Sequence, residues 1–503
     1  MHTPAARGQQ LAARDSALVR RILLAEDRRD ASSPALAEAA EHTDARVRLL
    51  ARRAAARIGD PHFAKRDSFP TPQGPPAYTD PAWRLRYRAL DKTHCDALRG
   101  ALADSVWAVR LHAIDLVDAE CAKDAAIVKV LHEVARSLPP NAVRRRGGAS
   151  WQPPAHAVVT LARVAPDSAR AMLPAFMRSR IPWVRVYSVR AAGVLADTAA
   201  LRAAARDDND NVKEAAIDLL AKLAGHGADD LYLAALTARG YQAVRAAARA
   251  LAGSPRRADV LAAALTTARR LRADSSETSR DTRLAVLDRV GEFGVPAQGA
   301  AIADLTADFD CAVAQKAADI AARFAIGGRA TAARCTPLPV RLSPDAAALA
   351  LGRDVRLRVV LADSSGGGSF TVHLRGDVAP IMAALILALA RSHYYDGLTW
   401  QRVEPDFVIQ GGSPGANEYI GNKRFVRDEL GTVPHVRGTV GMSTRGHDTG
   451  DAQWFVNLRD NLRLDRDYSV FGEVVDGIEV VDDILEGDVI ARIEVAEPAR
   501  GGG

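Results

Sequence analysis

Hydrophobic and polar residues follow two different periods along the chain, and the period changes near residue 335. Before that point apolar residues recur every three to four positions, as on one face of an α-helix, and residues 212–223 are a clear example. Many of these helices follow an acidic residue and a Val-Arg or related step, which recurs mostly at intervals of 26 to 38 residues. The steps are centred on Val47, Trp83, Val109, Val184, Val212, Val244, Thr282 and Val313.

This repeat predicts an all-α solenoid over residues 1–335. One helix pair of this length cannot bury its apolar face alone, so neighbouring pairs have to stack. The pattern resembles that of HEAT repeats, and we expect roughly seven to nine copies. The arginines of the repeated steps are expected to bond to neighbouring repeats, so none of them is a candidate for a functional site.

Residues 336–352 contain three prolines and predict a linker, after which alternation replaces the helical period. Residues 355–361 and 370–374 predict two strands, and residues 377–390 predict a helix with Pro380 in its first turn. This order indicates a mainly antiparallel sheet with capping helices over residues 353–497. Residues 498–503 are expected to be a flexible tail.

Composition and charge exclude several classes of protein. The net charge of +6 is small for 503 residues, aromatic residues make up 5 %, and the one basic block is Arg144-Arg145-Arg146, so nucleic acid is not an expected partner. The longest apolar run, residues 379–390, is too short to span a membrane. The four cysteines show neither metal-type spacing nor a disulfide framework, so we expect buried free thiols.

The first thirty residues contain no apolar core of a signal peptide, because four arginines interrupt them. We therefore expect a cytoplasmic protein. An exported or periplasmic location remains open if the true start lies upstream.

Three stretches of the alternating region carry residues that suggest a chemistry. They are DGLTWQRVEPDFVIQGG (396–412), GTVGMSTRGHDTGDAQWFVNL (438–458) and LDRDYSVFGEV (464–474). In the first, Arg402 lies in an otherwise apolar strand–turn–strand pattern that ends at Gln410. With these residues the chain from Arg353 to about Val495 resembles the cyclophilins, which are peptidyl-prolyl cis-trans isomerases. The resemblance implies an eight-stranded barrel with a helix over each end, of a bacterial kind.

Isomerisation of a prolyl bond makes and breaks no covalent bond, so the resemblance implies neither a metal nor a cofactor. The barrier of about 18–20 kcal/mol comes from the double-bond character of the amide. A catalyst has to hold the proline ring and stabilise the twisted amide. A guanidinium suits the second task because it stays charged in an apolar wall.

The resemblance assigns these tasks residue by residue. Arg402, Gln410 and Phe407 are implied to be catalytic; without the resemblance, Arg402 could be an ordinary arginine of a surface strand. The two glutamines, Gln410 and Gln453, are expected to bond the substrate backbone and to hold the arginine. The implied substrate-binding residues are Val408, Met442, Ser443, Gln453, Phe455, Leu464 and Tyr468.

Some positions depart from the family pattern, and others carry no assignment. Val408 replaces a more common methionine, Ser443 an alanine, Tyr468 a histidine and Arg463 a tryptophan. Phe471 is assigned to the core. His435 and His447 receive no role.

We therefore expect a peptidyl-prolyl isomerase that assists protein folding, with a solenoid that binds proline-containing clients or another protein. The alternative is a scaffold whose solenoid binds a partner, while the cyclophilin-like domain only grips proline-containing segments.

Overall fold

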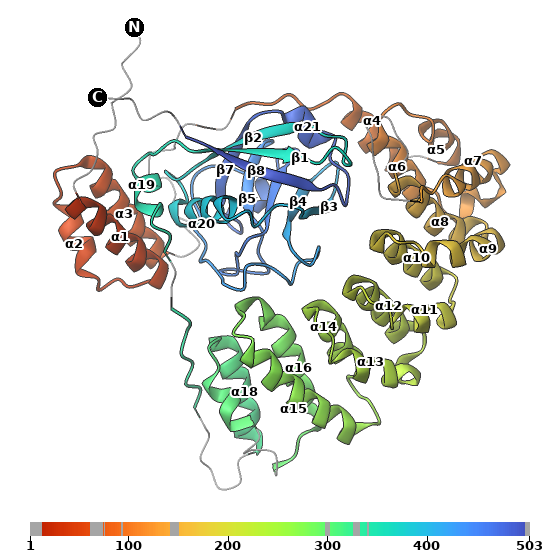
Figure 1. Ribbon diagram of the computed structural model, residues 1–503, viewed down its shortest axis with the longest axis horizontal. Coiled ribbons are helices and arrows are strands. Elements are labelled where there is room, and N and C mark those ends of the chain that lie inside the picture. Colours follow the sequence, from red (N-terminus) through yellow and green to blue (C-terminus); the bar gives the residue numbers. More distant parts are fainter. Residues whose placement is uncertain are drawn as a thin grey trace. The chain divides into compact units, whose positions relative to one another are not determined.

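The computed structural model describes residues 13–60, 74, 76–91, 94–140, 150–296, 302–324, 332–339 and 342–497 (Figure 1). The chain divides into two compact units. The sheet unit comprises Met1–Asp80, Val340–Pro414 and Phe425–Gly503, and the helical unit comprises Pro81–Pro339 and Gly415–Arg424. One boundary between the units lies at Pro339/Val340, inside the predicted linker, but the first 80 residues group with the sheet and not with the predicted solenoid.

An antiparallel eight-stranded sheet forms the centre of the sheet unit in the described residues. The strand order is β3-β4-β6-β5-β7-β2-β1-β8. The strands are β1 (Arg356–Leu361), β2 (Ser369–Leu374), β3 (Thr399–Val403), β4 (Val408–Ser413), β5 (Thr439–Met442), β6 (Trp454–Asn457), β7 (Val470–Asp476) and β8 (Ile490–Ala496).

The two edge strands of this sheet, β3 and β8, meet each other. Thr399 forms an isolated antiparallel bridge with Val489. The Trp400 N–H donates to the Asp488 carbonyl (2.9 Å), and the Ile490 N–H donates to the Leu398 carbonyl (2.8 Å). The sheet thus curls until its edges are joined, and the predicted antiparallel barrel is confirmed.

Helices α19 (Ala346–Ala350), α20 (Pro380–Arg391) and α21 (Ile478–Asp482) belong to the same unit (Figure 1). Strands β1 and β2 and helix α20 lie where the sequence predicted them, with Pro380 in the first turn of α20. The prediction of a linker over 336–352 is wrong for its last part. Ala346, Ala347 and Leu349 of α19 are buried in the core of the sheet unit, so this short Ala-rich segment is part of the fold.

Three helices from the beginning of the chain also pack into this core, namely α1 (Ala13–Arg28), α2 (Pro34–Ala40) and α3 (Ala45–Gly59). The buried Arg57 side chain fixes them in place. Its Nη1 donates to Glu26 Oε1 (2.6 Å), its Nε to the Leu430 carbonyl (2.7 Å) and its Nη2 to the Val378 carbonyl (2.9 Å). The prediction of one solenoid over residues 1–335 is therefore wrong at its beginning.

Successive helices stack in the helical unit, where every second helix from α4 to α18 contacts the next member of that series. The longer helices are α4 (Trp83–Leu90), α5 (Cys95–Ala101), α6 (Trp107–Leu116), α7 (Ala125–Arg136), α8 (Gln152–Val164), α9 (Pro166–Met177), α10 (Pro182–Val194), α11 (Thr198–Ala204), α12 (Asp210–Leu223), α13 (Asp229–Ala235), α14 (Tyr241–Ala250), α15 (Arg257–Ala273), α16 (Arg280–Phe293) and α18 (Cys311–Phe324). Short 3₁₀ turns are η2 (Ala119–Lys123), η3 (Gly225–Ala228), η4 (Glu277–Ser279) and η6 (Ala303–Ala307).

The repeated valine positions lie inside this stack, as the sequence predicted. Val109, Val184, Val212, Val244 and Val313 are all buried in one continuous core. Arginines link successive repeats in several places; for example, Arg185 donates from Nε and Nη2 to the two carboxylate oxygens of Asp207 (both 2.8 Å). The stacking agrees with a solenoid, and its assignment to the HEAT family stays a prediction.

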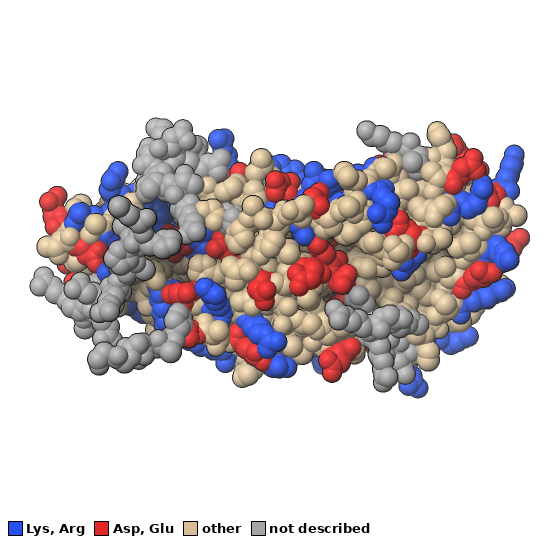
Figure 2. Space-filling view, turned by 90° about the horizontal axis from the view of Figure 1, so that it is seen from above, with Lys and Arg blue, Asp and Glu red and all other residues tan. Residues whose placement is uncertain are grey.

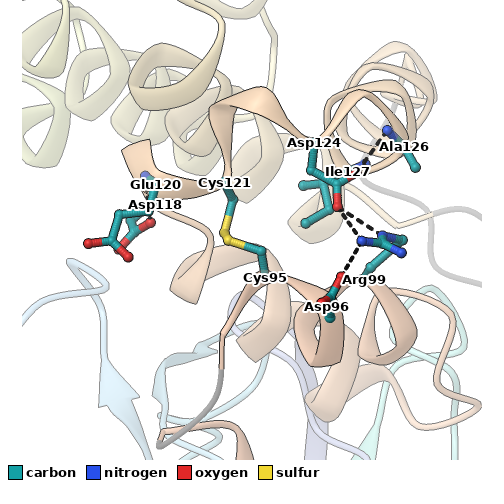
Figure 3. Close-up of a disulfide and its surroundings, with 9 residues drawn as sticks. All are labelled: Cys95, Asp96, Arg99, Asp118, Glu120, Cys121, Asp124, Ala126 and Ile127. Atoms are coloured by element: carbon teal, nitrogen blue, oxygen red, sulfur yellow. Dashed lines mark hydrogen bonds and ion pairs between the residues drawn. A yellow bond between two sulfur atoms is a disulfide. The ribbon is translucent and has the colours of Figure 1, made fainter.

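All four cysteines form disulfides, so the prediction of free thiols is wrong. Cys95 is bonded to Cys121 and Cys311 to Cys335. Figure 3 shows the first disulfide, which joins α5 to η2, with Arg99 bridging Asp96 and Asp124 nearby. Pairing of this kind depends on which helices become neighbours, and spacing along the sequence does not reveal it.

Charged side chains of both signs are interspersed on the face drawn in Figure 2. Within the described ranges, no helix is long and apolar enough to cross a membrane. The basic block Arg144-Arg145-Arg146 and the predicted tail at 498–503 lie outside the described residues.

Candidate active site

Strand register places the predicted site residues in one row across the outer face of the sheet. Arg402 of β3 pairs with Gln410 of β4, Gln410 pairs with Phe455 of β6, and Phe455 pairs with Gly441 of β5. Paired residues of antiparallel strands project to the same face. The sequence stretches around 402, 410 and 455 therefore meet because of the sheet topology.

Five apolar and aromatic side chains form a small cluster on this face, separate from the main core. Val408, Phe455 and Leu464 are buried in it, and Phe407 and Tyr468 pack against them. The rings of Phe455 and Tyr468 meet edge to face with centroids 5.7 Å apart. Because residues alternate along each strand, Ile409, Trp454 and Val456 point instead into the main core.

Met442 and Phe471 lie in the main core and not in this cluster. Met442 follows Gly441 in β5, so its side chain points to the opposite face, and it is 0 % exposed. Met442 therefore packs on the core side of the sheet and offers no surface to a ligand. The assignment of Phe471 to the core is confirmed, because it is 1 % exposed.

Gly441 is a member of the site that sequence reasoning missed. A Cβ atom at this position would lie 2.4 Å from the Phe455 ring, closer than any real Cβ contact. Because glycine has no side chain, the Phe455 ring can occupy this space. A glycine inside an otherwise apolar strand was the available signal.

The glutamines bind each other and Ser443. The Gln410 amide donates to Ser443 Oγ (2.8 Å), and the Gln401 amide donates to Gln453 Oε1 (2.9 Å). The Ser443 N–H donates to the Gln453 carbonyl (2.9 Å), which fixes the polar edge of the cluster. The prediction that Gln410 and Gln453 hold Arg402 is wrong in this structure.

Glu404 holds the Arg402 guanidinium instead. Arg402 Nε and Nη2 both donate to Glu404 Oε1, at 2.9 and 2.7 Å. The two residues are i and i+2 in one extended segment, so they share a face. The Arg402 side chain is 41 % exposed, and its guanidinium carbon lies 5.7 Å from the centroid of the Phe407 ring.

A hollow of about 470 Å³ opens beside Phe407. Its lining comes from two segments, one that includes Arg402 and Phe407 and one that includes Arg459 and Arg463. The Phe407 backbone is anchored there, because its carbonyl accepts hydrogen bonds from the Leu458 N–H and the Asn461 side-chain amide (both 3.0 Å).

His435, which had no predicted role, packs against the buried side of the cluster. Its ring stacks on Phe455 with centroids 5.7 Å apart, and its Nε2 lies 3.0 Å from the Tyr468 carbonyl, to which it donates. The Asn457 amide donates to the other ring nitrogen (3.1 Å). Burial lowers the pKa of His435, so the imidazole is held neutral in this arrangement.

The comparisons with known proteins agree on one part of the chain. The family described as cyclophilin type peptidyl-prolyl cis-trans isomerase matches residues 359–499. A peptidyl-prolyl cis-trans isomerase of Helicobacter pylori is 33 % identical over 130 residues, which are 25 % of this chain and 80 % of that protein. Isomerase B of Bacillus subtilis is 34 % identical over 131 residues, which are 26 % of this chain and 92 % of that protein.

Among solved structures, a cyclophilin-type isomerase of Cryptosporidium parvum matches with 22 % identity and a TM-score of 0.27. The match covers 29 % of this chain and 99 % of that structure.

Proposed function

Because the chain belongs to the family of cyclophilin-type peptidyl-prolyl cis-trans isomerases, we propose that its sheet unit accelerates isomerisation of the peptide bond before proline. The family match covers residues 359–499. The function of the helical unit is therefore a separate question.

The observation that carries this proposal is a half-exposed guanidinium beside an isolated apolar cluster. A proline ring can be received by Val408, Phe455 and Leu464, with Phe407 at the side. When the amide twists, its nitrogen loses conjugation and becomes a hydrogen-bond acceptor. A fixed cation next to the ring lowers the energy of that state more than the energy of either planar state.

Arg402 has donors left for this task. A guanidinium carries five N–H groups, and Glu404 accepts one hydrogen bond from Nε and one from Nη2. The Glu404 carboxylate also limits how the guanidinium can rotate. Gln410, Gln453 and Ser443 border the cluster, where their amide and hydroxyl groups can bond the backbone of an extended substrate.

The test is Arg402→Ala in the full chain, with prolyl isomerisation of a short peptide as the readout. We expect kcat/KM to fall roughly 10²- to 10³-fold, as for loss of a main electrostatic stabiliser. Arg358→Ala is the matched control, since Arg358 is also an exposed strand arginine, bonded to Glu494 (3.0 Å). Turnover in Arg402→Ala equal to that of Arg358→Ala would rule out the proposed role.

We also propose that the helical unit holds protein clients while the sheet unit acts on their prolines. A groove of about 410 Å³ runs along α9 to α12 and includes Met177 and Val189. Met177→Glu should slow proline-limited refolding of a protein client and leave turnover of a tetrapeptide unchanged. Equal refolding rates for several clients would instead favour a role other than client capture.

The two disulfides bear on where the protein folds. Disulfides persist in oxidising compartments and are rare in a reducing cytosol. We therefore propose an oxidising compartment in place of the expected cytoplasmic location. Thiol labelling of protein trapped directly from its native cells should find all four cysteines blocked, and labelled cysteines would return the location to the cytoplasm.

A further inference from the structure

The 3₁₀ turn η7 (Leu462–Leu464) joins the apolar cluster to the hollow beside Phe407. Leu464 is buried in the cluster, whereas Leu462 and Arg463 line the hollow. Leu462 is 58 % exposed, which is unusual for a large apolar residue in this chain. One short turn thus contributes both to the proposed proline pocket and to the surface next to it.

Arg463 lies over Phe407, with its guanidinium carbon 4.5 Å from the ring centroid. The same ring has Arg402 at 5.7 Å. A guanidinium stacked on an aromatic face keeps the N–H groups of its edge available, and it loses little further freedom when those groups bind.

The three arginines of the hollow differ in their partners. Arg402 is bonded to Glu404 and Arg459 to Asp406 (2.8 Å). Among the described residues, none forms a hydrogen bond or an ion pair with Arg463, whose guanidinium lies over the Phe407 ring instead.

The remaining acidic residue of the wall, Asp460, accepts a hydrogen bond from the Arg437 N–H (3.0 Å). Three arginines and three carboxylates line the hollow, so their formal charges cancel. The hollow therefore has no general attraction for anions. Any preference for a carboxylate has to arise locally, at Arg463.

We infer that Arg463 selects substrate segments that carry an aspartate or glutamate close to the proline. This inference rests on the proposed isomerase function and names its substrate class. A proline ring bound in the cluster would contact the Phe407 ring on one side. Arg463 covers that phenylalanine ring. An extended chain advances about 3.3–3.6 Å per residue, so a carboxylate within about three residues of the proline reaches the guanidinium. The carboxylate can then accept two parallel N–H bonds from it.

The experiment compares pairs of capped peptides that differ only in glutamate against glutamine, placed one to three residues before or after the proline. With the full chain, at least one position should give a glutamate-to-glutamine ratio of kcat/KM of roughly 3 to 10 at low salt. Arg463→Gln should bring that ratio to about one, and Arg463→Glu should invert it. Raising NaCl from about 20 to about 300 mM should shrink the wild-type ratio, because the pair is exposed to screening.

Arg466→Gln is the matched control, because Arg466 is an exposed arginine three residues further on that does not line the hollow. It should keep the wild-type ratio. Glutamate and glutamine peptides that react equally at every position would overturn the inference, and so would a ratio that persists in Arg463→Gln. In either case Arg463 serves only to pack on Phe407.

Binding of the same peptide pairs separates this inference from the proposed function. If no peptide is isomerised, the proposed function fails, and dissociation constants for the glutamate and glutamine peptides still decide the role of Arg463. Tighter binding of a glutamate peptide to the wild type but not to Arg463→Gln supports the inference. Equal or absent binding overturns it.

Discussion

The contacts that stabilise the sheet unit internally span long distances in sequence, whereas those that stabilise the helical unit internally are short-range. In the sheet unit, Arg57 bonds to the Leu430 carbonyl across 373 residues of sequence. In the helical unit, the disulfides join cysteines that are 26 and 24 residues apart. The sheet unit therefore combines its apolar core with buried polar contacts between distant segments. The helical unit is built from local stacking with covalent cross-links.

This contrast predicts that the two units lose stability under different treatments. A substitution at a buried long-range contact should act on the sheet unit. A reducing agent can act only on the helical unit, since all four cysteines of the chain lie there. Hydrogen exchange read out peptide by peptide reports on each unit separately.

The largest expected effect is that of Arg57→Ala. Burial by itself raises the pKa of the Glu26 carboxyl, but Arg53 and Arg57 outweigh burial and lower that pKa. Removing Arg57 takes away the closest cation of this buried carboxylate and leaves it the more distant Arg53 (3.6 Å) and the Coulombic effect of Arg29. The free energy of unfolding of the sheet unit should fall by about 3–5 kcal/mol, measured by urea unfolding with hydrogen exchange.

Arg52→Ala is the control for this substitution, since Arg52 is an exposed arginine on the same helix. It should change the stability by less than about 0.5 kcal/mol. If both variants behave alike, the helices α1–α3 do not stabilise the sheet unit, and the long-range side of the comparison is wrong.

Reduction of the disulfides should have the next largest effect. Loops of 26 and 24 residues correspond to about 2–4 kcal/mol per disulfide. Dithiothreitol should therefore lower the unfolding temperature of the helical unit and leave that of the sheet unit unchanged. Separate Cys95→Ser/Cys121→Ser and Cys311→Ser/Cys335→Ser variants should each reproduce part of the loss. A loss confined to the sheet unit would contradict the comparison.

A smaller, pH-dependent effect is expected from His435. Its pKa is lowered by burial in the folded protein, so the unfolded chain binds the proton more readily. The contribution of His435 to the free energy of unfolding is fully present above the ordinary pKa of about 6.5 and decreases as the pH falls below that value. The slope is at most about 1.4 kcal/mol per pH unit.

Glu429 opposes this slope in the wild type. Burial raises its pKa to about 7, which makes stability fall as the pH rises from about 4.5 to 7. The measurement is therefore the difference between wild type and His435→Gln in urea unfolding from pH 5 to 8. The difference should shrink toward low pH, and a difference that is constant across this range would contradict a buried neutral imidazole.

Sequence patterns predicted the elements whose partners are local. The valines at 184, 212 and 244 recur 28 and 32 residues apart, once in each repeat, and all three are buried in the continuous core of the helical unit. Strands β1 and β2 were predicted because residues 355–361 and 370–374 alternate and are joined by a short stretch rich in serine and glycine. Helices α1–α3 show the same amphipathic pattern as the solenoid helices, and the pattern does not say which surface covers the apolar face.

The candidate site also contains residues that were predicted and residues that were not. The resemblance to the cyclophilins named Arg402, Phe407, Val408, Phe455 and Leu464, and the structure brings these together. It did not name Glu404, which holds Arg402, because this contact depends on the particular side chain two residues along the strand. Met442 was named but lies on the core face, since one step along β5 reverses the direction of a side chain.

The division of the chain between the two units has a consequence for synthesis on the ribosome. Arg57 emerges long before Leu430, the residue to which it bonds 373 positions later. At roughly 5–20 residues per second, helices α1–α3 wait about 20–75 s for their partner surface. The apolar faces that these helices turn toward the sheet lack their partner during this interval, while the helical unit can already assemble repeat by repeat. Helices α1–α3 are thus synthesised first and covered last, whereas each repeat of the helical unit meets its neighbour soon after it is made.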